Sequence, residues 1–171
     1  MKKTLLFSII LLSLCSCEPR YLADARKSLA DSIQTNLLFC NYSINGNTSR
    51  NNGTIEIKKR TDKSVGLIIH LFEENEAVTK IAAEGVPLTG TLERIEIMTR
   101  SANITIVKIG NGNEAMYKST ATIEGWLHNK ELTRSGEQWE YDVEGELTIS
   151  YVFDNTKETA HIYNIQREQP E

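Results

Sequence analysis

The sequence predicts a mainly β domain, an antiparallel barrel of about eight strands with one N-terminal helix; a β-sandwich is the alternative. Three observations lead to this fold class. Stretches of alternating apolar and polar residues recur after residue 36, a pattern typical of strands that bury one face. Asn, Asp and Gly clusters between them supply turns. No second helical stretch follows the first, so no βαβ unit is predicted, and long strands in meander order favour the barrel.

The chain begins as a secretory signal peptide. Two lysines, Lys2 and Lys3, precede the uncharged apolar run 4–14, which is the arrangement of a basic n-region and an h-region. As a helix this run would rise only about 16 Å. A bilayer core of roughly 30 Å is too thick for it to cross.

The apolar run ends in Leu14-Cys15-Ser16-Cys17, which resembles the lipobox of bacterial lipoproteins. The resemblance implies cleavage after Ser16 and acylation of Cys17. Cys15 fits less well, because Leu14 would then stand where a small residue is required. Two or more acyl chains anchor a protein stably, so the predicted partner is a lipid bilayer. The predicted location is the cell envelope, at the outer membrane, with the periplasmic and surface faces both open.

Removal of the signal leaves 155 of the 171 residues and changes the formal net charge from −4 to −6, because Lys2 and Lys3 are lost. That length fits one domain. An acidic chain without a long Lys/Arg cluster lacks the basic surface patch that binding of nucleic acid requires. Cys40 is the only thiol left, so no disulfide can form within the mature chain, and its apolar surroundings predict a buried, inert thiol.

The mature chain divides into a helical start, one β domain and a tail. Apolar residues at three-to-four spacing predict a helix over 21–34. The predicted divisions are a signal peptide over 1–16, a lipidated N-terminus and helix over 17–35, a single β domain over 36–166 and a loose tail over 167–171.

Alternation and turn signals predict eight or nine strands. They cover 37–44, 54–58, 65–72, 78–82, 92–98, 103–109, 116–127, 141–151 and 160–166, with turns at 45–47, 51–53, 61–64, 110–113 and 154–157. The stretch 83–90 contains Pro87 and predicts a loop. Gly145, in the middle of the clearest strand, predicts a bend or bulge of the kind that closes barrels.

No catalytic, metal or cofactor residue is predicted, and the chain is interpreted as a non-enzyme. Its three histidines, His70, His128 and His161, lie dozens of residues apart, unlike the close ligand pairs of metal sites. The acidic residues 142, 144 and 146 share one face of a strand. Such a row could hold Ca²⁺ or form a glycosidase pair, but a solvated outer face explains it better.

Three aromatic residues are candidate ligand-facing side chains: Trp126, Trp139 and Tyr141. Such rings can line the mouth of a barrel for an apolar or sugar ligand, although filling of the core is the simpler interpretation. Asp31-Ser32-Ile33 resembles the D-S/T-aliphatic acceptor of O-glycosylation in Bacteroidota, which makes Ser32 a candidate modification site.

The lipobox and the strand pattern together resemble the small exported lipoproteins of Bacteroidota, several of which have a calycin- or lipocalin-like barrel. No G-x-W opens the first strand, so a lipocalin ligand is not carried over. The leading hypothesis is a tethered, non-enzymatic domain that binds a small molecule or glycan in or on the barrel. The alternative is a structural or protein-interaction module of the envelope, and a hydrolase ranks third.

Overall fold

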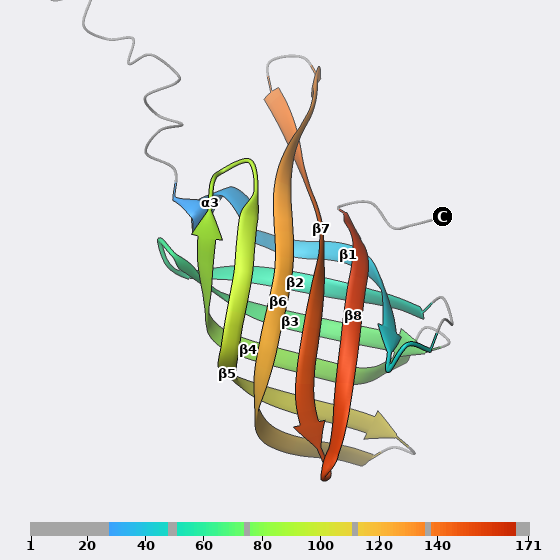
Figure 1. Ribbon diagram of the computed structural model, residues 1–171. Coiled ribbons are helices and arrows are strands. Elements are labelled where there is room, and N and C mark those ends of the chain that lie inside the picture. The colour runs from blue at the N-terminus through green and yellow to red at the C-terminus, as the bar shows by residue number, and fades with distance from the viewer. Residues whose placement is uncertain (1–27, 48–50, 74–75, 111–112, 136–137, 167–171) are drawn as a thin grey trace, which may run out of the picture.

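The computed structural model describes residues 28–47, 51–73, 76–110, 113–135 and 138–166. Eight antiparallel strands follow one another around a closed barrel, and the last pairs with the first (Figure 1). The predicted barrel is therefore confirmed, and the sandwich is not adopted. The strands are β1 Thr35–Ile44, β2 Asn51–Thr61, β3 Ser64–Glu73, β4 Glu76–Gly90, β5 Ile95–Gly110, β6 Asn113–Ser135, β7 Gln138–Phe153 and β8 Thr156–Gln166.

The interior of the barrel is packed with aliphatic side chains. Ile55, Ile69, Ile123, Leu147 and Ile149 each have an exposed fraction of 0%. A side chain with no accessible surface has no water-sized space beside it, so the barrel is not hollow around these residues. Native interiors reach this density because side chains interdigitate.

The short helix α3, Leu29–Ile33, closes one end of the barrel (Figure 1). Ala30 and Ile33 are fully buried in the core. A capping box fixes the start of the helix, since the Ser28 side chain accepts from the Asp31 backbone and the Asp31 side chain accepts from the Ser28 backbone. Lys59 on β2 adds an ion pair, with its Nζ 2.9 Å from Asp31 Oδ2. Among the described residues, no helix is long and apolar enough to cross a bilayer.

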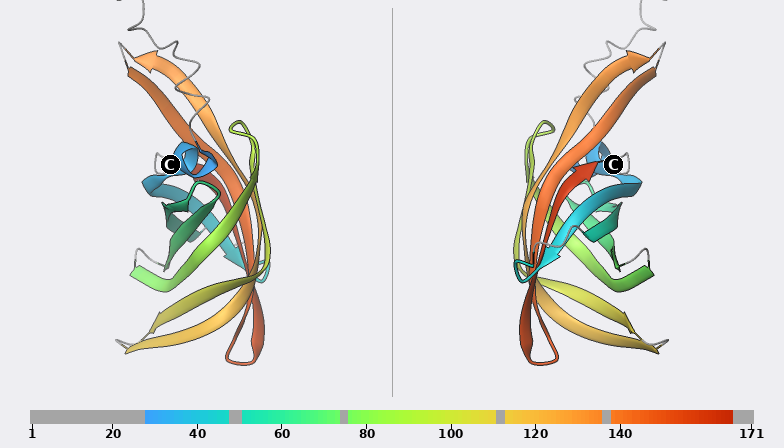
Figure 2. Two further views of the ribbon diagram at one scale, coloured as in Figure 1. Left: turned by 90° about the vertical axis from the view of Figure 1, so that its left-hand side faces the viewer. Right: turned by 90° about the vertical axis from the view of Figure 1, so that its right-hand side faces the viewer.

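A polar cluster fills the opposite end. The Tyr151 hydroxyl donates to Glu158 Oε2 at 2.9 Å, and Lys108 Nζ lies 2.7 Å from Glu158 Oε1. Lys108 also lies over the Phe153 ring, 4.1 Å from its centroid, and the Tyr117 ring packs against Phe153 edge-on at 4.4 Å. Beyond the two ends, the β5–β6 and β6–β7 hairpins project in opposite directions (Figure 2).

Two predicted breaks are wrong because β-bulges were mistaken for loops. The stretch 83–90 belongs to β4, where the register against β5 shifts between Ala83 and Leu88 and Gly85 has a φ of 64°. Pro87 is tolerated there because an irregular ladder does not need its missing N–H. Likewise, the strands predicted over 92–98 and 103–109 form one strand, β5, with a shift between Thr99 and Ala102.

The predicted turn over 51–53 is also wrong. Asn51, Asn52 and Gly53 begin β2, where Gly53 pairs with Cys40 of β1. A Cβ at Gly53 would come within 3.0 Å of Cys40 Sγ, so glycine is needed for close approach rather than for a turn. Of the helix predicted over 21–34, the structure describes the residues from 28 onward, and 21–27 lie outside the described residues.

Candidate functional site

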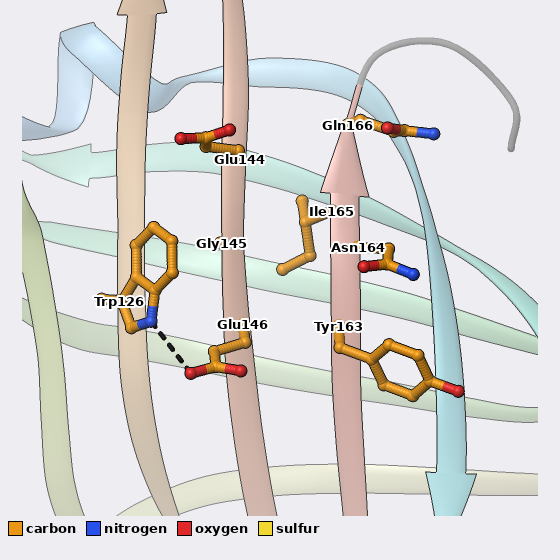
Figure 3. A pocket seen from close by; sticks show the side chains of 8 residues that line it. All are labelled: Trp126, Glu144, Gly145, Glu146, Tyr163, Asn164, Ile165 and Gln166. Carbon is orange, nitrogen blue, oxygen red and sulfur yellow. Dashed lines mark hydrogen bonds between the residues drawn. The ribbon is translucent and has the colours of Figure 1, made fainter. Parts of the chain in front are cut away.

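A groove of about 400 Å³ lies over β6, β7 and β8 and opens to solvent (Figure 3). Apart from Ile165, which is buried in the core, its side chains belong to the outer wall of the barrel. The lining residues are Trp126, Glu144, Gly145, Glu146, Tyr163, Asn164, Ile165 and Gln166. Aromatic rings, carboxylates and amides therefore meet in one place.

Strand alternation places the indole and both carboxylates on the outer wall. Leu127 and Leu147 are fully buried, so their neighbours Trp126 and Glu146 point outward. Trp126 and Glu146 are paired across β6 and β7. The indole Nε1–H donates to Glu146 Oε1 at 3.0 Å (Figure 3). This bond fixes the ring edge toward β7.

Two glycines allow β6 and β7 to approach closely beside this pair. Gly145 lies opposite Leu127, and Gly125 lies opposite Leu147. A Cβ at Gly145 would come closer than 3.0 Å to the Trp126 carbonyl oxygen. Gly125 has a φ of 152°, which disfavours L side chains, and a Cβ there would meet the Glu146 carbonyl oxygen.

A β-bulge in β8 brings two consecutive side chains into the groove. Gly145 pairs with Ile165 and Leu147 with Ile162, so β8 has one residue more than β7 over this interval. Both Tyr163 and Asn164 consequently line the groove, between the buried residues Ile162 and Ile165. The register between β7 and β8 shifts next to Gly145, where an irregularity was predicted, but the extra residue lies in β8 and not in the strand of Gly145. Such bulges commonly redirect side chains at functional sites.

Asn164 takes a φ of 52° at this bulge, a conformation that Asn tolerates better than most residues. Its Nδ2 donates to Asn41 Oδ1 at 3.1 Å, and Asn41 Nδ2 donates to Asn52 Oδ1 at 3.1 Å. Asn41 is 9% exposed. A row of amides thus runs from the groove across β1 to β2 and orients Asn164.

Two of the three histidines support the groove from its margins. His128 Nδ1 lies 3.1 Å from Glu144 Oε1. His161 Nε2 lies 3.7 Å from Glu146 Oε2, and its ring stacks on Tyr163 with centroids 5.3 Å apart. His70 lies on β3, where burial lowers its pKa and nearby Lys80 lowers it further. In the described part of the chain, no group of three or more His, Cys, Asp or Glu could hold a metal ion.

Arg94 approaches Trp126 from the β4–β5 connection. Its Cζ lies over the indole ring, 4.7 Å from the centroid. The turn is held by Thr91, whose N–H donates to the Arg94 carbonyl at 3.0 Å. The Arg94 side chain is 58% exposed, and its Nε lies 3.9 Å from Glu96 Oε1, so it is held only weakly.

Of the three predicted ligand-facing residues, Trp126 lines the groove, on the outer wall rather than at the mouth of a hollow barrel. Trp139 and Tyr141 lie in β7, and their side chains are outside the described residues. Tyr163, Asn164 and Gln166 were not predicted as site residues. The signal that could have found Asn164 is a polar residue that breaks the alternation between Ile162 and Ile165.

The predicted modification sites have different surroundings. Ser32 is 8% exposed, and its hydroxyl donates to the Leu29 carbonyl at 2.7 Å, so O-glycosylation would have to precede folding. Cys17 lies outside the described residues. Cys40 is fully buried, and its burial raises the pKa of the thiol to about 12.

Chemically, the groove offers flat apolar faces beside hydrogen-bonding groups. The Glu144 and Glu146 side chains are 42% and 50% exposed, and their oxygens can accept bonds from ligand hydroxyls or amines. Asn164 and Gln166 contribute amides that both donate and accept. Comparison of the chain with protein-family models, curated proteins and solved structures finds no match.

Proposed function

We propose that the protein is a lipid-anchored envelope lipoprotein whose barrel binds a glycan in the groove on its outer wall. The observation that carries this proposal is the row Trp126–Glu146–Tyr163 across three adjacent strands (Figure 3). Neighbouring strands lie about 4.8 Å apart, so the Cα atoms of Trp126 and Tyr163, which are two strands apart, lie roughly 10 Å from each other. A carboxylate between two rings suits a sugar, which presents apolar C–H faces and hydroxyl edges.

The packed interior supports binding on the barrel rather than in it. Ligand pockets combine apolar walls with a few well-placed polar groups, and in this chain the groove has that composition. Because the groove is open, an extended chain can pass along it with its ends in solvent. A glycan of several units therefore fits the groove better than an enclosed apolar molecule.

The carboxylate pair is interpreted as a pair of acceptors and not as glycosidase machinery. Glycosidases place their two carboxyl groups on either side of the scissile bond, whereas Glu144 and Glu146 stand side by side on β7. Both are also half-exposed, unlike the buried acids that such enzymes use. We expect no release of new reducing ends from any polysaccharide that binds.

Glycan binding is tested by affinity electrophoresis of the full chain through gels that contain soluble glucan, xylan or mannan. Truncation of a central aromatic residue commonly removes much of the binding energy, so Trp126→Ala and Tyr163→Ala should each weaken retardation at least roughly tenfold. Tyr117→Ala is the matched control, because it removes an exposed ring at the far end of the barrel.

Loss of retardation in the groove variants with retention in the control supports the proposal. Equal retardation of wild type and Trp126→Ala would overturn it. No retardation by any of these polysaccharides, with native circular dichroism, would also overturn it and would favour the interaction module.

The tether is tested separately, by mass spectrometry and fractionation of cells that express the chain. We expect the Cys17→Ala variant to lose both the acyl mass and the membrane association. Cys15→Ala is the control and should remain acylated. Acylation of the Cys17→Ala protein would show that the anchor is elsewhere.

Cys17 and Ser28 are eleven positions apart, and an extended chain spans at most about 3.5 Å per residue. The end of the barrel that α3 closes would thus stay within about 40 Å of the lipid. The groove would then bind glycans that lie close to the membrane surface.

A further inference from the structure

The charged side chains that line the groove are all negative, and this excess of negative charge affects which ligands the groove can bind. The charged side chains that line it are Glu144 and Glu146, and the other lining residues are neutral. Like charges brought together are costly, so acidic sugars are disfavoured. A ligand with a positive charge gains instead from both carboxylates.

A positively charged side chain already lies over the face of the Trp126 ring at one side of the groove. The Arg94 guanidinium lies over Trp126, 4.7 Å from the ring centroid. The negative face of an indole attracts cations, so this contact shows that the Trp126 ring is accessible to one. Because Arg94 is 58% exposed and lies 3.9 Å from Glu96, little holds it in place.

We propose that the groove selects sugars that carry a protonated amine, and that Arg94 occupies the cation position until such a sugar displaces it. This inference rests on the proposed glycan-binding function. The sugar ring would stack on Trp126 or Tyr163 with its ammonium directed toward Glu146. Glu146 Oε1 accepts the Trp126 Nε1–H, whereas Oε2 lies 3.7 Å from His161 Nε2, beyond hydrogen-bond distance. Oε2 can therefore accept a bond from the ammonium.

The test uses two probes of identical backbone: the β-1,4-linked glucosamine tetramer and its fully N-acetylated form. Each is titrated calorimetrically into the full chain in non-ionic detergent at pH 6.5 and low salt. The amine form should bind up to about fivefold more tightly, because the ammonium gains an exposed ion pair with Glu146, while its cation–π contact replaces the one that Arg94 gives up. Added salt should reduce the preference by screening.

Three variants separate local from general electrostatics. Glu146→Gln should remove most of the preference, measured as the ratio of the two affinities in the same variant, whatever its effect on the acetylated tetramer alone. Glu114→Gln removes the same charge from the distant β5–β6 hairpin and should keep the preference. Arg94→Gln should strengthen binding of the amine form roughly two- to fivefold, because no guanidinium has to be displaced.

Equal or tighter binding of the acetylated tetramer would overturn the inference. So would loss of the preference in Glu114→Gln, which would assign it to net charge, or weaker binding of the amine form in Arg94→Gln. If uncharged glycans bind in a Trp126-dependent manner without any preference for amines, the charge selectivity alone fails. If Trp126→Ala changes the binding of no glycan, the proposed function itself fails.

Discussion

Substitution of Gly145 by alanine should destabilise the barrel, because the new methyl group has no space. A Cβ at this position would meet the Trp126 carbonyl oxygen closer than 3.0 Å, Leu127 Cδ2 at 3.0 Å and Leu127 Cα at 3.1 Å. Two of these atoms belong to the backbone of β6, so a side-chain rotation cannot relieve the overlap. β6 and β7 must separate, which strains the ladder where the Trp126–Glu146 pair is formed.

Overpacking of this kind costs about 1–3 kcal/mol, and a clash with backbone places Gly145→Ala near the upper value. For a chain of this length each kcal/mol lowers Tm by about 2–4 °C, so we expect a decrease of roughly 6–12 °C. Urea and thermal unfolding followed by far-UV circular dichroism measure the change.

Gly110→Ala is the matched control for this substitution. A Cβ at Gly110 meets nothing within 4 Å, and its φ is not positive. Replacement of such a glycine commonly stabilises a protein by about 0.4–1 kcal/mol. A Gly145→Ala protein that unfolds within about 0.5 kcal/mol of wild type would refute the close approach of the two strands.

Three further predictions concern the core and the two ends of the barrel. Burial raises the pKa of Cys40 from 9.0 to about 12. The folded state therefore gains stability while the thiol stays protonated, and this contribution is fully present below pH 9 and is lost as the pH rises toward 12. Unfolding free energy should therefore fall more steeply from pH 8 to 11 in wild type than in Cys40→Ala, and parallel curves would contradict this. Ser28→Ala removes the cap of α3 and should cost about 1 kcal/mol in urea unfolding; no change would show that the cap contributes nothing. Lys108→Met leaves Glu158 without its cation and should lower the free energy of unfolding by about 1–3 kcal/mol relative to Lys118→Met, an exposed control; equal values would contradict the end cluster.

The fold class was predictable because strand alternation and turn chemistry are local signals. Residues 141–151 alternate without interruption, and Asp154 and Asn155 adopt the positive φ expected of a tight turn. The strand boundaries in β4 were not predictable in the same way. Gly85 and Pro87 are typical of loops, and only pairing with β3 and β5 on both sides keeps that stretch extended.

Only part of the candidate site was visible in the sequence. Trp126 was identified from its size and its position on a strand. Tyr163 and Asn164 enter the groove because β8 has an extra residue relative to β7. The register between two strands depends on how they pair, so it cannot be predicted from the sequence of either strand alone. Glu146 was interpreted as a solvated residue, and its exposure agrees with that, but its bond to Trp126 depends on strand pairing.

The most direct test of a binding groove on the outer wall is an NMR titration of the protein with an oligosaccharide that it retains. The indole N–H of Trp126 reports the groove, since it donates to Glu146, and the methyl groups of Ile69, Ile123 and Ile149 report the interior. We predict that the Trp126 indole resonance shifts in proportion to ligand bound while these methyl resonances stay in place. Shifts of the interior methyl groups with an unchanged Trp126 signal would contradict the account and place the ligand inside the barrel.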